Sequence, residues 1–144
     1  MNFSGVLLWI RRDWLWPLLI YGTVLTVSGR SEVAVPSGLN FFQADKLAHF
    51  LVFGALATAM IRIPEIRGLG RRSGLLVMVL VSLAGAADEL WQSFTPGRVV
   101  EVDDWLADTA GGIVATLCYL HWPWYRRLLE TPVFRKMRSQ SSGD

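Results

Sequence analysis

Four apolar stretches dominate the chain, and short polar clusters separate them. They run from about 14 to 28, 47 to 63, 74 to 94 and 105 to 124. A helix needs about 17–25 residues to cross a bilayer, and the last three stretches have that length. The first is shorter, and Pro17 is expected in its first turn, where no helical hydrogen bond is lost. The pattern predicts an all-α polytopic membrane protein with four transmembrane helices in a small bundle.

The first stretch also allows a second interpretation. Arg11 and Arg12 precede about 15 apolar residues, and Ser28 and Gly29 follow them, as in a signal peptide. We favour a retained helix, because the stretch is at the upper end of the length range for the apolar region of a signal peptide and lacks a clean cleavage motif. The other three helices are predicted in either case.

Composition supports a membrane domain. The chain has 144 residues, of which 52% are hydrophobic and 18% charged, whereas a soluble domain carries about 25% charged residues. We therefore expect one membrane domain over residues 1–144. Cys118 is the single cysteine, which excludes a disulfide framework or a cysteine-based metal site within one chain. The net charge is +2, and the basic residues behind it lie in the pattern expected of membrane loops, so no nucleic-acid partner is expected.

The basic residues predict an orientation. Eleven of the 14 lysines and arginines precede the first stretch, separate the second from the third, or follow the fourth. Positive loops stay cytoplasmic, so both termini are expected inside, with a basic cytoplasmic tail over 125–144 on the anionic inner leaflet. The loops after the first and third helices are expected outside.

The acidic residues have the opposite distribution, since eight of twelve lie at the predicted outer ends. Three polar clusters stand there: Asp45-Lys46-x-x-His49, Asp88-Glu89-x-x-Gln92, and Arg98 followed by Asp104 and Asp108. Spacings of three and four residues direct each set from one helix face. Charges at the edge of lipid are costly, so the convergent set is a candidate functional site.

Structural alternatives remain for several of these charges. Asp45 could cap the second helix, and Asp103 could cap the fourth, because helix N-caps favour aspartate. Lys46 could extend to the interface, and Arg98 could be a solvated charge or a lipid headgroup contact. Small residues below the clusters, such as Gly54, Gly85 and Ala107-x-x-x-Gly111-x-x-x-Ala115, predict that the last three helices approach closely.

Charge counting raises the question of a metal. Five carboxylates (Asp45, Asp88, Glu89, Asp104 and Asp108) face two fixed cations and one histidine. The surplus must be protonated, hydrated or bound to a cation. A divalent metal is one solution, with Asp88, Glu89, Asp104 and His49 as its predicted ligands.

The same clusters resemble the VanZ-like family in order and spacing over roughly residues 41–118. The matching segments are Asp45-Lys46-Leu47-Ala48-His49-Phe50, residues 88–98 (DELWQSFTPGR) and residues 104–112 (DWLADTAGG). Many members have Asn where this chain has Asp108. The resemblance implies a small integral membrane protein of the bacterial cell envelope, in the cytoplasmic membrane. The founding member is associated with low-level glycopeptide resistance. The resemblance implies no particular reaction.

The favoured hypothesis is a membrane-embedded hydrolase or transferase acting on a phosphate- or sugar-bearing envelope lipid. Its predicted catalytic residues are His49, oriented by Asp45, and Asp88, Glu89 and Asp104 as metal ligands or a second acid–base group. Its predicted headgroup-binding residues are Lys46 and Arg98, with Gln92 and Asp108 orienting the others.

Two other classes of function stay open. A non-enzymatic factor would use the same residues to bind a cell-wall lipid, a glycopeptide antibiotic or a partner membrane protein. An ion pathway is disfavoured, because the polar residues do not continue through the inner halves of the helices. The substrate and the oligomeric state are left open.

Overall fold

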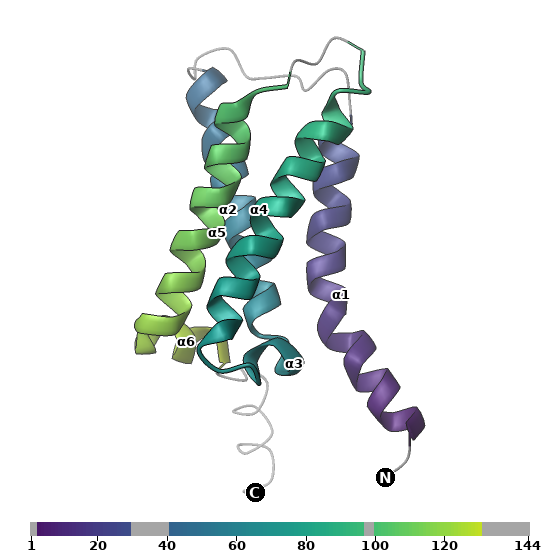
Figure 1. Cartoon of the computed structure of the whole chain (residues 1–144), viewed down its shortest axis with the longest axis vertical. Coiled ribbons are helices and arrows are strands. Elements are labelled where there is room, and N and C mark those ends of the chain that lie inside the picture. The colour runs from purple at the N-terminus through teal and green to yellow at the C-terminus, as the bar shows by residue number, and fades with distance from the viewer. Residues whose placement is uncertain (1–2, 30–40, 97–99, 131–144) are drawn as a thin grey trace, which may run out of the picture.

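The described part of the chain consists of helices joined by short turns. The computed structural model describes residues 3–29, 41–96 and 100–130, and no strand occurs among them (Figure 1). The helices are α1 (Phe3–Ser28), α2 (Phe41–Ile61), α3 (Pro64–Arg67), α4 (Arg72–Gln92), α5 (Val102–His121) and α6 (Pro123–Glu130). The predicted all-α class is therefore confirmed.

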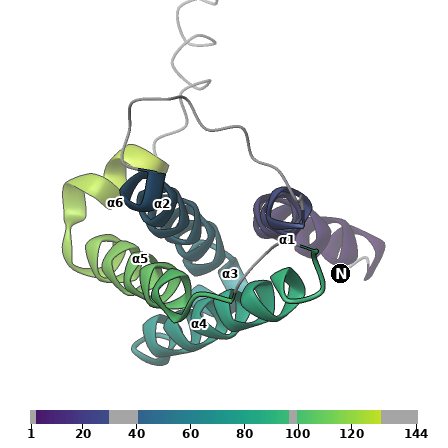
Figure 2. The same ribbon diagram turned by 90° about the horizontal axis from the view of Figure 1, so that it is seen from above.

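The four long helices run alternately up and down (Figure 1). Seen from above, α2, α4 and α5 form a close group, and α1 lies beside α2 and α4 (Figure 2). Consequently α1 and α4 end where α2 and α5 begin, at the upper end of Figure 1. The short helices α3 and α6 lie at the opposite end.

Small residues allow the close approach of α2, α4 and α5. A Cβ added at Gly111 would collide with the carbonyl of Phe50, so α2 and α5 come into backbone contact there. A Cβ at Gly112 would lie 2.6 Å from Val81 of α4, and one at Gly85 would lie 2.8 Å from the Asp108 carboxylate. The glycine pattern thus predicted the correct helix contacts.

Several boundary predictions were wrong. Helix α1 begins at Phe3, so Pro17 lies in its interior and not in the first turn. Helix α2 begins at Phe41, which places Asp45 inside the helix, where it is not the N-cap. The N-cap of α5 is Glu101, with no side-chain capping bond, so Asp103 is not a cap either. Additional residues at each start extend these helices beyond their apolar cores.

The last predicted helix ended at 124, but the chain turns earlier and forms α6, which was predicted as part of the basic tail. Glu130 at its end accepts hydrogen bonds from the Tyr119 hydroxyl at 2.5 Å and from Arg67 at 3.1 Å. Arg62 donates to the carbonyl of Leu129 at 3.0 Å. These contacts hold α6 against α2, α3 and α5. Residues 131–144 of the predicted tail lie outside the described residues.

The distribution of polarity is that of a membrane protein. Two helical segments in the described chain, Ala44–Ile61 and Arg72–Gln92, are long and apolar enough to span a bilayer. Large apolar side chains face outward, with Leu75 67% and Leu18 64% exposed, whereas the carboxylates of Asp88 and Asp108 are fully buried. Exposed leucines around buried aspartates are typical of helices that face lipid.

Candidate functional site

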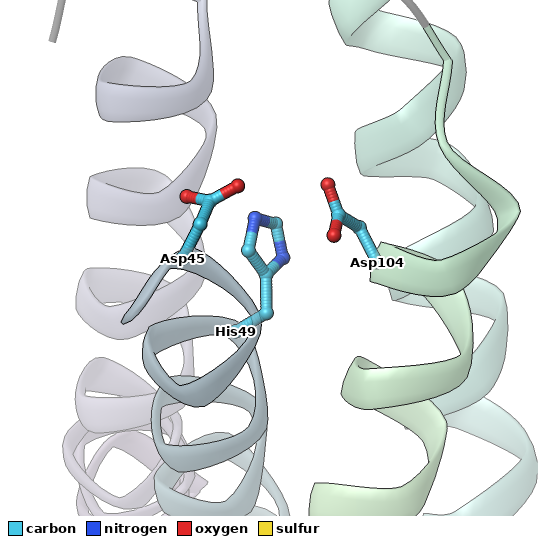
Figure 3. A group of neighbouring side chains, drawn as sticks. All are labelled: Asp45, His49 and Asp104. Carbon is cyan, nitrogen blue, oxygen red and sulfur yellow. The ribbon is translucent and has the colours of Figure 1, made fainter. Parts of the chain in front are cut away.

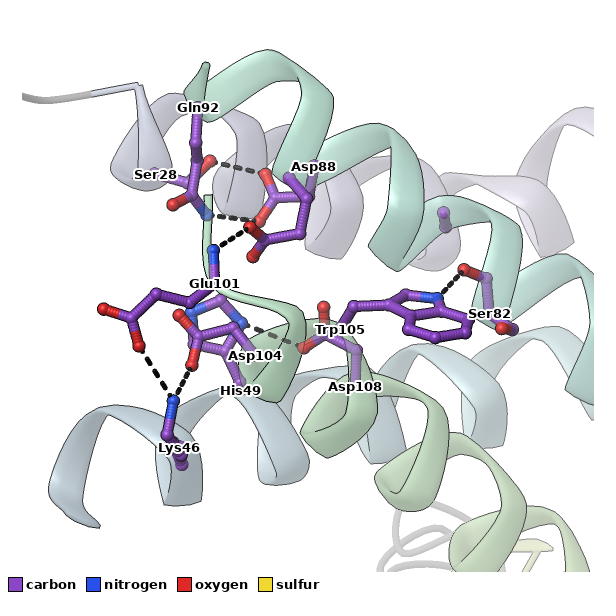
Figure 4. Close-up of polar contacts among 12 residues, drawn as sticks. Ser28, Lys46, His49, Ser82, Asp88, Gln92, Glu101, Asp104, Trp105 and Asp108 are labelled. Atoms are coloured by element: carbon purple, nitrogen blue, oxygen red, sulfur yellow. Dashed lines mark hydrogen bonds and ion pairs between the residues drawn. The ribbon is translucent and has the colours of Figure 1, made fainter. Parts of the chain in front are cut away.

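Eight of the nine predicted site residues lie at the same end of the bundle, on α2, α4 and α5. Arg98 lies outside the described residues. The eight divide into a group between α2 and α5 and a group on α4, and Figure 4 shows the contacts of Lys46, His49, Asp88, Gln92, Asp104 and Asp108. The group between α2 and α5 contains Asp45, Lys46, His49, Asp104 and Asp108, and the group on α4 contains Asp88, Glu89 and Gln92.

His49 is the centre of the first group. Its Nδ1 lies 2.9 Å from Oδ1 of Asp108, which is completely buried. The ring stacks on Phe53, with 6.4 Å between centroids. Asp108 therefore orients His49, which corrects the prediction that Asp45 does so. Because Nδ1 is engaged, Nε2 is the ring nitrogen left for a proton, a substrate or a metal.

Lys46 links α2 to the start of α5. Its ammonium group donates to Asp104 at 2.6 Å and to Glu101 at 3.1 Å. Asp104 is buried, whereas the Glu101 side chain is 44% exposed. The first pair is thus sheltered and the second faces solvent, where an ion pair contributes little.

Asp45, His49 and Asp104 form a candidate metal-binding group. One ligand atom from each lies within 4.8 Å of the others. Figure 3 shows the His49 ring standing between the two carboxylates. A histidine whose second nitrogen is held by a carboxylate is a common metal ligand, and Asp108 provides that carboxylate. Compared with the predicted set, Asp45 is included and Asp88 and Glu89 are not.

Two buried carboxylate oxygens have no hydrogen-bond partner among the described residues. They are Oε1 of Glu89 and Oδ2 of Asp108. The other oxygen of Glu89 accepts a 3.0 Å bond from the backbone N–H of Glu101, which ties α4 to the start of α5. Unsatisfied buried carboxylate oxygens are costly, and a proton, water or cation can compensate them.

Asp88 belongs to a different contact. Its carboxylate accepts hydrogen bonds from the Ser28 hydroxyl at 2.5 Å and from the Gln92 amide at 3.1 Å. The Ser28 bond joins the end of α1 to α4, and Trp91 reinforces the contact by donating to the carbonyl of Leu25. Asp88 therefore anchors α1, Gln92 supports Asp88 from within α4, and neither is part of the metal-binding group.

The VanZ/LLP1 family model matches residues 4–125. The chain belongs to the VanZ/LLP1 family. The comparisons with curated proteins and with solved structures found no significant match.

The match to VanZ/LLP1 includes all nine predicted site residues. Sequence reasoning missed two others that contact them, Ser28 and Glu101. Ser28 carries no charge and ends an apolar stretch, so nothing distinguished it from a polar boundary residue. Glu101 could have been found from its charge at the start of α5, since Lys46 was already expected at this end.

Proposed function

We propose that this VanZ/LLP1 protein is a membrane enzyme that hydrolyses or transfers the phosphate group of an envelope lipid at the outer face of the bacterial cytoplasmic membrane. The observation that carries the proposal is the His49 ring. The ring is held by a hydrogen bond to buried Asp108 and lies between Asp45 and Asp104. Lys46 precedes His49 by three residues on the same face of α2. A cation, an oriented base and spare carboxylates are the groups that phosphate chemistry needs.

His49 is the proposed proton acceptor. With Nδ1–H donating to Asp108, Nε2 carries a lone pair that can remove a proton from water or from an acceptor hydroxyl. The oxygen so activated forms a bond to phosphorus, and the bond from phosphorus to its leaving oxygen breaks. The Asp108 carboxylate stabilises the imidazolium formed, in the same way as the buried carboxylate of a catalytic triad.

Lys46 is the proposed headgroup ligand. Its bond to Glu101 is exposed, so a lipid phosphate can replace the Glu101 carboxylate while Asp104 keeps the ammonium group in position. Arg98, which follows Pro96 and Gly97, a pair typical of turns, is proposed as a second phosphate ligand. Lys46 lies at the end of the bundle that the positive-inside pattern predicts to be outside, and Arg98 belongs to a loop predicted on the same side.

A divalent cation would be held by Asp45, Asp104 and Nε2 of His49. When bound, it would act as a Lewis acid on a phosphate oxygen. His49 would then be a ligand, because Nε2 cannot bind an ion and a proton together. In that case Glu89, whose Oε1 has no partner in the described chain, is the proposed proton acceptor.

The test is lipid turnover by the purified full-length protein in nanodiscs. A panel of phosphatidic acid, phosphatidylglycerol, a polyprenyl phosphate and a polyprenyl diphosphate sugar is supplied, and products are identified by mass spectrometry. We expect one lipid to be consumed by the wild type and not by His49→Gln. His121→Gln is the matched control, since His121 lies at the opposite end of α5 and is exposed.

Two results would count against the enzyme. Turnover by His49→Gln at the wild-type rate would remove the proposed base. A lipid could instead bind the wild type without ever being converted, and its binding could be lost in Lys46→Gln. That result would favour the non-enzymatic binding factor.

A further inference from the structure

An apolar groove follows the outward face of α2 below the polar site. It has a volume of about 780 Å³ and is lined by residues of α1, α2, α5 and α6. On α2 the lining includes Phe50, Gly54 and Thr58 at four-residue intervals, and Arg62 continues this interval just beyond the helix. Lys46 lies one turn before Phe50 on the same helix face. The groove therefore begins directly below the ammonium group of the candidate site.

The groove starts where the two site helices touch. Phe50 follows His49 in sequence, and its carbonyl meets Gly111, which comes three residues after Asp108. Small residues, including Gly54, Ala55 and Ala115, hollow the groove below this contact. A ligand held at Lys46 and His49 would thus have the groove as its continuation along the membrane normal.

Among the described residues that line the groove, no buried side-chain nitrogen or oxygen lacks a hydrogen-bond partner. The Thr58 hydroxyl donates to the carbonyl of Gly54 at 2.9 Å and lies 3.3 Å from the Tyr125 hydroxyl. The two charged lining residues, Asp13 and Arg62, stand at the far end. Hydrocarbon can fill the groove without leaving a buried donor or acceptor unsatisfied.

The far end is a poor entrance for an anionic headgroup. Arg62 already donates to the Leu129 carbonyl, and Asp13 adds a negative charge to the same end. Trp124, Tyr125 and Leu129 of α6 line this end as well.

The groove dimensions suit one hydrocarbon chain. From Phe50 to Arg62 the lining spans about 18 Å at 1.5 Å per residue. A single hydrocarbon chain fits this length, and the lining is mainly apolar.

We infer that this groove holds the hydrocarbon tail of the lipid whose phosphate lies at Lys46 and His49. The inference rests on the proposed function and adds the part of the substrate that the polar site does not contact. A tail in a bilayer gains little hydrophobic free energy by moving from lipid into the groove. The groove serves mainly to orient the headgroup, which is a positioning effect.

The test uses hexadecyl phosphate with a diazirine placed either beside the phosphate or beside the terminal methyl. Each probe is added to the full-length protein in phosphatidylcholine nanodiscs, irradiated, and its attachment sites are mapped by mass spectrometry. We expect the phosphate-proximal probe to label residues near Phe50 and the terminal probe to label peptides with Ala59 and Cys118.

Ala55→Trp fills the groove, and Val114→Trp fills it from α5. Both side chains are exposed and line the groove. We expect both variants to lose the terminal label. Ala86→Trp, on an exposed position of α4 outside the groove, should keep it. Equal terminal labelling in all three variants would overturn the inference. So would a reversed pattern, in which the terminal probe labels residues near Phe50 and the phosphate-proximal probe labels the far end of the groove.

Labelling requires no turnover, so the two proposals fail separately. A labelled groove without any lipid conversion would refute the enzyme and keep the lipid site. Conversion of a lipid without groove labelling would refute the tail site alone.

Discussion

At the scale of single residues, the decisive contact is the one between His49 and Asp108. A histidine at the edge of lipid needs a partner for at least one ring nitrogen. The carboxylate of Asp108 is buried and lies 2.9 Å from Nδ1. This bond defines which nitrogen is available for chemistry.

Removing the Asp108 side chain should therefore remove most of the activity. We expect Asp108→Ala to lower lipid turnover by about 10²–10⁴-fold, the usual contribution of an oriented base. Asp108→Asn should retain somewhat more activity than Asp108→Ala, because the amide oxygen can still accept the Nδ1–H bond, although the charge that stabilises the imidazolium is lost. Rates measured in nanodiscs at saturating lipid test this order. Equal losses in the two variants would show that the hydrogen bond is not the relevant contact.

The metal-binding group leads to a separate prediction. Isothermal titration of the purified protein with Mn²⁺ and Mg²⁺ should detect a site that weakens in Asp45→Asn and in Asp104→Asn, because each variant replaces a charged ligand. Asp103→Asn is the matched control, since Asp103 is adjacent but exposed and outside the group. Equal heats in all three variants and the wild type would exclude this site. Chelation should lower turnover only where binding is observed.

At the scale of helices, α2 and α5 are held together by the closest backbone approach found at any glycine of the described bundle. The carbonyl of Phe50 occupies the space that a Gly111 side chain would need. This contact lies directly below His49 and Asp108. Packing in the apolar half of the bundle thus determines the distance between the two site residues.

Gly111→Ala should destabilise the protein by about 1–3 kcal/mol, the usual cost of overpacking, because the obstructing atoms are backbone. Gly22→Ala should be neutral or stabilising, since nothing lies within 4 Å of its added Cβ and alanine favours a helix. Thermal unfolding in detergent, followed by circular dichroism, compares the two. A Gly111→Ala protein as stable as the wild type would contradict the close approach.

The contact of α6 with the bundle should depend on pH. The hydrogen bond from Tyr119, followed by the charge of Arg67, holds the pKa of the Glu130 carboxyl below its ordinary value. Because this pKa is lower in the folded protein, the ionised carboxyl stabilises the contact fully above about pH 4.3, the pKa of glutamate in an unfolded chain. The stabilisation is lost as pH falls through the lower pKa of the folded state.

Hydrogen exchange of residues 123–130, corrected for intrinsic rates, should accordingly increase in acid. In Glu130→Gln the same segment should exchange faster at neutral pH and lose this dependence on pH. An identical acid response in the variant would show that another group is responsible.

At the scale of the whole molecule, the prediction concerns direction in the membrane. The alternating long helices and the distribution of basic residues together predict four crossings with both termini in the cytoplasm. In a Cys118→Ser background, a cysteine at Ser37 should react with an impermeant maleimide in intact cells. A cysteine at Glu65, which is exposed between α2 and α4, or at Ser141 should react only after the cells are opened. The reverse pattern would invert the topology and place the site inside.

The sequence by itself determined the helical class, the end of the bundle at which the polar residues gather, and the small residues that bring the helices together. Each depends on local periodicity: runs of apolar residues, spacings of three and four, and glycine repeats such as Gly111-Gly112. Boundaries were harder to predict, because polar residues such as Lys46 continue a helix beyond its apolar segment when neighbouring helices satisfy them. The predicted cap roles of Asp45 and Asp103 failed for that reason.

Only the tertiary structure decided which polar residues contact one another. Spacing predicted Asp45 as the partner of His49, whereas the approach of α2 to α5 at Gly111 brings Asp108 to Nδ1. Asp88 and Glu89 are adjacent in sequence, yet successive helix positions point about 100° apart. Asp88 therefore bonds Ser28 of α1, whereas Glu89 bonds the backbone at the start of α5. Periodicity fixes the face of one helix, whereas pairing depends on how separate helices rotate and pack.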